Sequence, residues 1–547
     1  MAAGGLIWYL SRPLTIGEKP VTTLTSTATM TELVTSSSVL SGYARFDPRD
    51  ASTFSNPLRV PSPSGEVFGI IESPSNASIN VKSRSLEILP GKPTELWVYE
   101  VGHNGKQVIN PVLRLKKDET FKATLANGIS QKTIIHWHGM IVDWKNDGHP
   151  SYAIGQDQTY DYSFQVYNRG GTYWYHPHPH PAAQQVYKGL ASFFIVQDQN
   201  DERVTKSLDL QLGTTDIPLM IQDKRFNDAG PLEYSPTPDE NFMGFLGDMI
   251  LVNLTPNPYL EVTTRVYRFR ILNASSARAY RLALVRGSER HPFYIIGVDA
   301  GLLEKPYKVD EVFVGPAERV EILLDLRTLS PGDVIFLKSL QFDPMHAEEL
   351  LMGEMAGGMA GGSRLEDGED FHILKLAVKD KVTYDAQIPE KLSVIEPIDI
   401  SAAEERPISL SASMAMKEGR HLMRWLINGE SFDMNTYPIQ TTRDKVEIWK
   451  VTNSVQSMPH PMHIHGYLFQ VLERTDSPPQ IRRLAVDSQG RIPTDLGWKD
   501  TVLIWPQETV TIAIDFKTRF AGEQNYLFHC HNLEHQDGGM MINYKVT

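Results

Sequence analysis

Short runs of alternating apolar and polar residues, separated by turn residues, fill most of the chain. The first block contains ELWVYEV, TFKATLANG, KTIIHWHG and YDYSFQVYNRGGTYWYH, which are rich in aromatic and β-branched residues. The same pattern recurs in RVYRFRILNASS and ERVEILLDL, and a third time in KVEIWKVTN, YLFQVLERT, DTVLIWP and TVTIAIDF. No long pattern of period 3.6 interrupts these runs. Strands at ~8–12-residue spacing in three blocks predict an all-β protein of Greek-key β-sandwiches or barrels.

Polar loops near residues 196–205 and 378–391 separate the three blocks. The chain of 547 residues is too long for a single hydrophobic core, because one domain usually takes ~100–200 residues. A Ser/Thr-rich stretch at residues 22–38 resembles an extracytoplasmic tether. The predicted divisions are a tail at 1–78 leading into domain 1, domain 1 at 79–200, domain 2 at 201–384 and domain 3 at 385–547.

Charge and cysteine usage exclude several classes of protein. The formal net charge of −13 leaves no basic stripe for a nucleic acid, so we expect none as a partner. No run of ~18 apolar residues occurs, so we expect no membrane span in this chain. The single cysteine, Cys530, cannot form an internal disulfide. It remains a buried apolar residue, a nucleophile or a metal ligand.

Histidine is concentrated in four short motifs that hold eleven of the 17 histidines. Because residues i and i+2 of a strand point to the same face, each His-x-His pair directs two imidazoles toward one point. Four converging pairs predict a multinuclear metal centre with eight imidazole ligands. The motifs are HWHG (His136, His138), HPHPH (His176, His178, His180), HPMHIH (His460, His463, His465) and HCH (His529, His531) with the later His535.

Cys530 lies between His529 and His531, and the strand alternation sends it to the opposite side. One strand therefore contacts two metal sites. A thiolate, two imidazoles and a weak axial methionine form a blue-copper electron-transfer site. Copper fits better than zinc or non-haem iron, which favour several cysteines or a carboxylate in their sites. The expected partners of the thiolate are His460, His535 and the axial Met540.

With these four motifs the chain resembles the three-domain multicopper oxidases, the family that contains laccases, bilirubin oxidases and cuprous oxidases. The resemblance covers roughly residues 79–547 and implies three cupredoxin-like Greek-key β-sandwich domains with four copper ions. By motif position, it implies a type 1 copper at His460, Cys530, His535 and Met540, a type 2 copper at His136 and His463, and a type 3 pair at His138, His176, His178, His465, His529 and His531. His180 is left to support these ligands.

The reaction that the resemblance implies is the coupling of four one-electron oxidations to the reduction of O2 to water. Proton delivery requires carboxylates near the cluster. Asp147 matches the position of an aspartate that the family places near the type 2 water, and its alternative role is that of a turn residue before Gly148. Many relatives have a glutamate directly after the last type 1 histidine. Here Gln536 cannot ionise, so Asp537 is the second candidate proton donor.

The expected partners are O2 and a small reducing substrate, either a phenol or aromatic amine or a low-valent metal ion such as Cu(I) or Fe(II). The Met-rich loop at 345–363 offers soft ligands for Cu(I), or it is flexible filler. The soft ligands are Met345, His346, Met352, Met355 and Met359, which Met414, Met416 and Met423 would extend.

Three hypotheses about the function remain open. The chain is a cuprous oxidase, a laccase-like oxidase of phenols, or a structural or copper-binding protein without turnover. Some relatives lose their copper ligands and take structural roles, whereas this chain retains every ligand. Copper enzymes of this type are normally extracytoplasmic, and the tether agrees with such a location. The sequence does not fix the oligomeric state, and a monomer is compatible with it.

Overall fold

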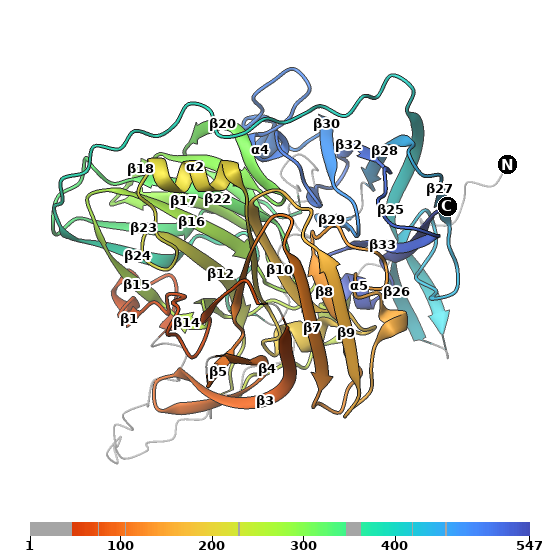
Figure 1. Cartoon of the computed structure of the whole chain (residues 1–547), viewed down its shortest axis with the longest axis horizontal. Coiled ribbons are helices and arrows are strands. Elements are labelled where there is room, and N and C mark those ends of the chain that lie inside the picture. Colours follow the sequence, from red (N-terminus) through yellow and green to blue (C-terminus); the bar gives the residue numbers. More distant parts are fainter. Residues whose placement is uncertain are drawn as a thin grey trace, which may run out of the picture. The chain divides into compact units, whose positions relative to one another are not determined.

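The computed structural model describes residues 46–74, 76–103, 105–227, 230–345, 363–417, 420–454 and 457–547. Strands dominate these residues, and the few helices are short (Figure 1). The strands form six sheets, two from each predicted block. The prediction of an all-β chain is therefore confirmed.

The first block forms two five-stranded sheets that enclose a common core. Along β7 buried and exposed residues alternate, as expected of a strand with one face on a core. Val81 and Leu125 from one sheet and Trp137 and Phe194 from the other belong to that core. One sheet has the order β5 (Lys106–Ile109), β4 (Lys92–His103), β3 (Ala77–Leu89), β7 (Thr120–Asn127) and β9 (Thr159–Gln165); the other has the order β2 (Ile70–Glu72), β6 (Val112–Lys116), β11 (Ser192–Gln197), β10 (Gly171–Pro177) and β8 (Ile135–His138).

The second block forms two seven-stranded sheets. One contains β1 (Asn56–Pro57), β15 (Pro258–Thr263), β24 (Phe371–Asp380), β23 (Val334–Ser339), β17 (Tyr280–Arg286) and β18 (Glu289–His291), with β21 (Val312–Val314) paired to β17. The other has the order β14 (Thr255–Pro256), β13 (Met249–Val252), β12 (Asp216–Lys224), β16 (Val266–Asn273), β22 (Arg319–Asp325), β19 (Phe293–Val298) and β20 (Gly301–Val309). All residues of β12 and β16 are buried, because this sheet is covered on both faces.

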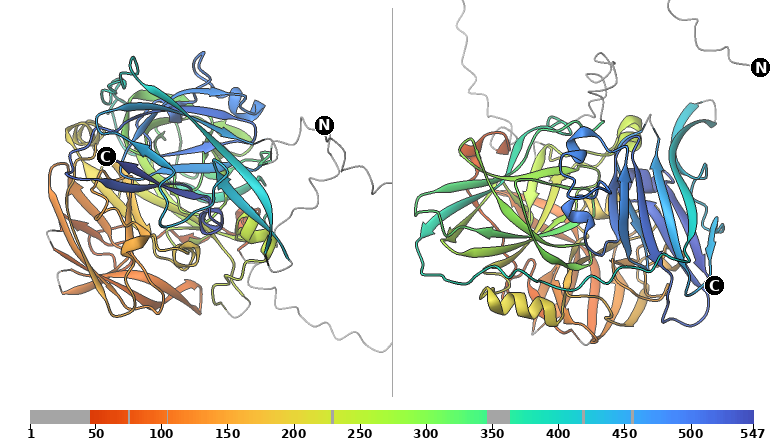
Figure 2. Two further views of the ribbon diagram at one scale, coloured as in Figure 1. Left: turned by 90° about the vertical axis from the view of Figure 1, so that its right-hand side faces the viewer. Right: turned by 90° about the horizontal axis from the view of Figure 1, so that it is seen from above.

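The third block forms two five-stranded sheets around a core that includes Cys530 and Met540. Figure 2 shows these sheets in cyan and blue. One has the order β26 (Arg420–Ile427), β25 (Glu404–Lys417), β28 (Val446–Asn453), β32 (Thr509–Asp515) and β30 (Phe469–Thr475); the other has the order β27 (Ile439–Thr441), β34 (Met541–Val546), β33 (Gln524–Cys530), β29 (His460–Ile464) and β31 (Thr501–Ile504).

Short helices connect the strands. They are α1 (Ala183–Tyr187), α2 (Gln199–Ser207), α3 (Pro238–Met243), α4 (Pro479–Arg482) and α5 (Leu533–Asp537), with 3-10 turns η2 (Ala51–Thr53), η3 (Pro150–Tyr152) and η4 (Pro493–Asp495). Among the described helices none has both the length and the apolar run needed to cross a bilayer.

The predicted tail contains two strands, and a long irregular segment follows the second block. Strands β1 and β2 fall within the tail predicted at 1–78, where β1 pairs with β15 and β2 pairs with β6. Residues 381–403 contain no helix or strand, and this teal segment runs between the second and third blocks (Figure 1). Arg169 donates hydrogen bonds to Ser393 and to the carbonyl of Val394 along it. The boundaries at 200/201 and 384/385 stay predictions.

Candidate metal centre

Strand register places the histidine motifs side by side in pairs. In the first block β8 is antiparallel to β10, with His136 opposite His176. In the third block β29 is antiparallel to β33, with His463 opposite His529 and Met462 opposite Cys530. The side chains of directly opposite residues share one face of a sheet. The two pairs of strands therefore present imidazoles toward each other across the two blocks.

All the predicted histidine ligands and Cys530 are buried, and they fall into compact groups. Within each group one potential ligand atom per residue lies within 4.8 Å of the others. Among the described residues the groups are His136, His138 and His463; His138, His176 and His531; His178, His465 and His529; His460, Cys530 and His535; and His136, Asp147 and His465.

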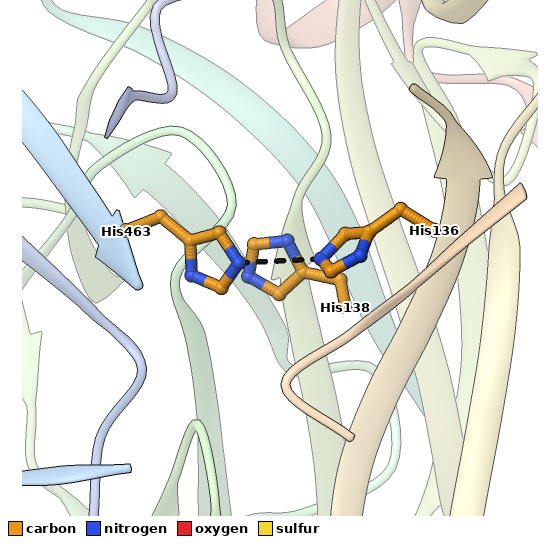
Figure 3. Close-up of side chains that lie close together, drawn as sticks. All are labelled: His136, His138 and His463. Atoms are coloured by element: carbon orange, nitrogen blue, oxygen red, sulfur yellow. Dashed lines mark hydrogen bonds between the residues drawn. The ribbon is translucent and has the colours of Figure 1, made fainter. Parts of the chain in front are cut away.

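The pair His136 and His463 shows why such a group fits a metal ion. The Nδ1–H of His136 donates to the carbonyl of Asp147 at 2.7 Å, and that of His463 donates to the carbonyl of Asp500 at 2.8 Å. Each Nε2 is then an acceptor, because a neutral imidazole has only one N–H. The two Nε2 atoms nevertheless face each other at 3.3 Å (Figure 3). Two facing lone pairs in a buried site repel each other unless a cation lies between them, so the pair is suited to hold a metal ion.

The same arrangement occurs between His465 and His529. The Nδ1–H of His529 donates to the carbonyl of Cys530 at 2.9 Å, and that of His465 donates to Asp147 Oδ2 at 2.7 Å. Their Nε2 atoms face each other at 3.0 Å. The Nε2 of His178 lies 3.3 Å from that of His529 and completes this group.

The group of His138, His176 and His531 differs in one nitrogen. The Nε2 atoms of His176 and His531 are 3.3 Å apart, whereas His138 approaches His176 Nε2 with its Nδ1, at 3.4 Å. The reason is that His138 Nε2 lies 3.0 Å from Asp500 Oδ1. The carboxylate accepts from Nε2–H and leaves Nδ1 as the free lone pair.

Burial favours the neutral form, which is the form that binds metals, at nine of these imidazoles. Burial lowers the pKa of His460 to about 3 and also lowers the pKa of His463. It places the pKa of the following residues well below the usual range: His138, His176, His178, His465, His529, His531 and His535.

The group that contains the Cys530 thiol shares no residue with the other groups. Cys530 Sγ is 3.5 Å from the Nδ1 atoms of both His460 and His535, which are 3.2 Å from each other. Met540 is fully buried beside them, and its carbonyl accepts from the Cys530 N–H at 3.0 Å. Burial raises the pKa of the Cys530 thiol well above its ordinary value. The neutral thiol therefore predominates here until a metal displaces its proton.

Asp147 connects two imidazoles from different blocks. Its carbonyl accepts from His136 and its Oδ2 accepts from His465, while Oδ1 has no hydrogen-bond partner. It also lies in the turn that the sequence predicted. The next residue must be glycine, because Gly148 has a φ of +88° and a Cβ there would lie 2.2 Å from the carbonyl oxygen of Ile135.

Two further residues of the site, Asp500 and Arg319, were not predicted from the sequence. Asp500 accepts from His138 with its carboxylate and from His463 with its carbonyl, and Arg319 donates to both of its carboxylate oxygens. Burial alone would raise the pKa of Asp500, but the Arg319 guanidinium and His138 hold it well below the usual range. The one sequence signal was that an acidic residue, Asp500, opens the run DTVLIWP directly before β31.

Asp537 is the last residue of α5 and lies outside the histidine groups, with its carboxylate at the start of α1. It accepts from the N–H groups of Ala182 and Ala183 at 2.7 and 2.9 Å. Burial raises its pKa to about 7, and these two N–H groups oppose the shift. The neighbouring Gln536 is fully buried, with no hydrogen-bond partner for either polar atom of its side chain.

The remaining predicted residues contribute no ligand group to the described structure. His180 is exposed, and its ring packs edge-to-face on Phe432 at 5.1 Å. Met345 packs at the edge of the third-block core. The rest of the Met-rich loop, with His346, Met352, Met355 and Met359, lies outside the described residues, as do the side chains of Met414, Met416 and Met423.

Comparisons with known proteins agree with this arrangement. Three family models described as multicopper oxidase match residues 80–201, 174–343 and 405–547. The multicopper oxidase mco of Staphylococcus haemolyticus is 32% identical, over 82% of this chain and 84% of that protein. The laccase of Bacillus subtilis is 29% identical, over 83% and 91%. The cell division protein FtsP of Photorhabdus laumondii is also 29% identical, over 82% and 84%.

Solved structures show the same fold. McoA multicopper oxidase from the hyperthermophile Aquifex aeolicus superposes with a TM-score of 0.78 and 41% identity, covering 90% of this chain and all of that one. A multicopper oxidase from Campylobacter jejuni, described as a metallo-oxidase, gives a TM-score of 0.70 and 25% identity over 92% of this chain and 98% of that one. The three cupredoxin-like domains implied by the histidine motifs are thereby confirmed.

Proposed function

This chain belongs to the multicopper oxidase family, and from that premise we propose that it couples four one-electron oxidations of a small donor to the reduction of O2. The balance is one O2, four protons and four electrons giving two molecules of water. The proposal rests on two buried imidazole pairs, His136 with His463 and His465 with His529, whose Nε2 lone pairs face each other at 3.3 and 3.0 Å.

Four copper ions fit the groups that the structure assembles. We assign the type 1 ion to His460, Cys530, His535 and Met540, and the type 2 ion to His136 and His463. The type 3 pair takes His138, His176 and His531 on one side and His178, His465 and His529 on the other. Bound copper supplies one-electron redox chemistry and a binding site for O2.

The residues of the chain connect and orient these sites. Cys530 joins the type 1 group to His529 on one side and to His531 on the other, through one peptide bond each, and so provides a short covalent path between the two centres. Asp147 and Asp500 fix which nitrogen of each imidazole carries the proton. We assign proton handling near the cluster to Asp147, whose Oδ1 has no hydrogen-bond partner, and farther out to Asp537.

Two donor classes are compatible with the family. The relatives include a laccase and a metallo-oxidase, so a phenol or aromatic amine and a low-valent metal ion are both candidate substrates. A role without turnover, as a structural protein, is disfavoured because each histidine and cysteine position of the four motifs carries a residue that can bind copper. We place the protein outside the cytoplasm, on the grounds of the Ser/Thr-rich stretch at 22–38 and of its copper chemistry.

Oxygen uptake by the copper-loaded protein tests this function. We expect uptake with Cu(I) or with hydroquinone, and no release of hydrogen peroxide. If the Cu(I) rate collapses when Met352, Met355 and Met359 are all changed to Leu, the protein is a cuprous oxidase that recruits its ion through the loop. If it does not change and hydroquinone reacts as well, the protein is laccase-like. No uptake with either donor would refute the proposal.

A further inference from the structure

Both imidazoles of the proposed type 1 site are closed off from solvent. His460 and His535 each have an exposed fraction of 0%. An organic donor that must touch a ligand imidazole therefore has no open route to either one. The residues that cover the two rings therefore determine which electron donors react. This inference rests on the oxidase function proposed above.

The indole of Trp425 provides the cover. It lies on β26 and is 2% exposed, and its ring centroid is 4.7 Å from those of both His460 and His535. It also stacks on Phe242 of α3, with centroids 4.5 Å apart and planes at 2°. Its Nε1–H donates to the carbonyl of Phe242 at 2.7 Å. Trp425 is thus fixed by one stacking contact and one hydrogen bond.

The outward nitrogens of the two imidazoles are also held by the protein. His460 Nε2 lies 2.8 Å from Ser457 Oγ, and His535 Nε2 lies 3.1 Å from the side-chain amide of Asn532. The same amide donates to the carbonyl of Met243 at the end of α3. Neither imidazole therefore presents a nitrogen edge to solvent.

Several contacts fix helix α3 in place, so Phe242 holds Trp425 over the two imidazoles. Thr237 and Glu240 form a capping box at its start, and Glu240 pairs with Arg225 at 2.6 Å. Just after the helix, the N–H of Phe245 donates to Glu534 Oε2 on α5. An aromatic electron donor would have to separate the stacked rings of Trp425 and Phe242 to reach the two imidazoles.

We infer that Trp425 determines donor specificity by denying aromatic donors contact with the two imidazoles. Metal ions and metal complexes that transfer an electron without inserting a ring are then the favoured substrates. Replacing the indole by a methyl group opens a space of ring size directly over both imidazoles. Such a space admits a phenol but changes little for a donor that reacts through the protein surface.

The test compares two donors in copper-loaded variants. Trp425→Ala should raise kcat/KM for hydroquinone at least about tenfold, mainly through a lower KM, because a new pocket binds the ring. The rate with hexaammineruthenium(II), which reacts without inserting a ring, should change by less than about threefold. The type 1 absorption and EPR spectra should be unchanged, since no ligand is altered. An equal change for both donors would overturn the inference.

A second readout does not depend on turnover. Cys530 is the single cysteine, so alkylation of the copper-free chain by N-phenylmaleimide reports access to this site alone. Trp425→Ala should be alkylated at least about tenfold faster than wild type. The matched control is Trp449→Phe, a buried indole in the same core whose Nε1–H donates to Glu447. It should behave as wild type in both assays. Unchanged alkylation of Trp425→Ala would contradict the inference.

Phe242→Ala removes the ring that stacks on Trp425 and leaves β26 intact. It should show the same pattern, and it keeps the test decisive if Trp425→Ala does not fold. The two proposals fail separately. If wild type shows no type 1 spectrum and no oxygen uptake with hexaammineruthenium(II), the proposed oxidase function is wrong. If wild type turns over but both variants respond like Trp449→Phe, only the role of Trp425 is wrong.

Discussion

The ion pair between Asp500 and Arg319 gives the sharpest prediction about stability. Both side chains have exposed fractions of 0%, and Arg319 donates to both carboxylate oxygens. At an effective dielectric constant of about 20, unit charges ~4 Å apart interact by about 4 kcal/mol. The carboxylate of Asp299 is 3.6 Å from Arg319 and retains part of this attraction. Asp500→Asn should therefore lower the unfolding free energy of the copper-free chain by about 3 kcal/mol.

The assay is urea unfolding of the copper-free chain followed by tryptophan fluorescence. The double variant Asp500→Asn with Arg319→Met removes both charges, so it should recover part of the loss, with a coupling of about 1–3 kcal/mol. The folded-state pKa of Asp500 is depressed below the unfolded value of about 3.9. Its contribution is thus fully present above that value and is lost as the pH falls through the folded pKa. The deficit of Asp500→Asn should be constant between about pH 5 and 8 and shrink below about pH 4.

Two results would refute this reasoning. The first is an Asp500→Asn variant as stable as wild type at neutral pH. The second is a double variant no more stable than Asp500→Asn alone, which would show that the loss does not come from an uncompensated Arg319.

Four further predictions follow from single side chains. Cys530→Ser should abolish the blue colour and turnover while the trinuclear coppers stay bound; metal analysis and EPR would contradict this if every copper is lost. Asp147→Ala should weaken copper at the trinuclear group by about 10–100-fold, measured by chelator competition, with an unchanged type 1 spectrum. Gly148→Ala should disturb the same group, because its Cβ would meet Ile135; a wild-type EPR spectrum would count against the strain argument. Burial lowers the pKa of Lys224 to about 7, against about 10.4 unfolded, so Lys224→Met should stabilise the copper-free chain most below pH 7 and progressively less toward about pH 10. A pH-independent difference in urea midpoint would rule this out.

The strand pattern and the histidine motifs were readable from the sequence because they are local. A strand alternates its side chains, so HCH had to send Cys530 and its two neighbours to opposite sides. The structure does place Cys530 with His460 and His535, and His529 with His465. Strong local periodicity of this kind specifies both the fold class and the candidate ligands.

Contacts between distant residues were not readable in the same way. Asp500 and Arg319 are separated by 181 positions and meet only when the second and third blocks fold against each other. Trp425 belongs to an ordinary-looking strand, and its stacking on Phe242 depends on a helix 183 positions earlier. The coordinating nitrogen of His138 depends on Asp500, so the motif HWHG alone could not give it.

Four bound copper ions would let one chain store the four electrons needed to reduce O2. The measurement is an anaerobic reductive titration of the copper-loaded protein, followed by a single addition of O2. We expect each chain to take up four electrons, one of them at the blue chromophore, and to be fully reoxidised by one O2 without release of hydrogen peroxide. Uptake of fewer than four electrons by fully loaded protein, or release of peroxide in place of water, would contradict it.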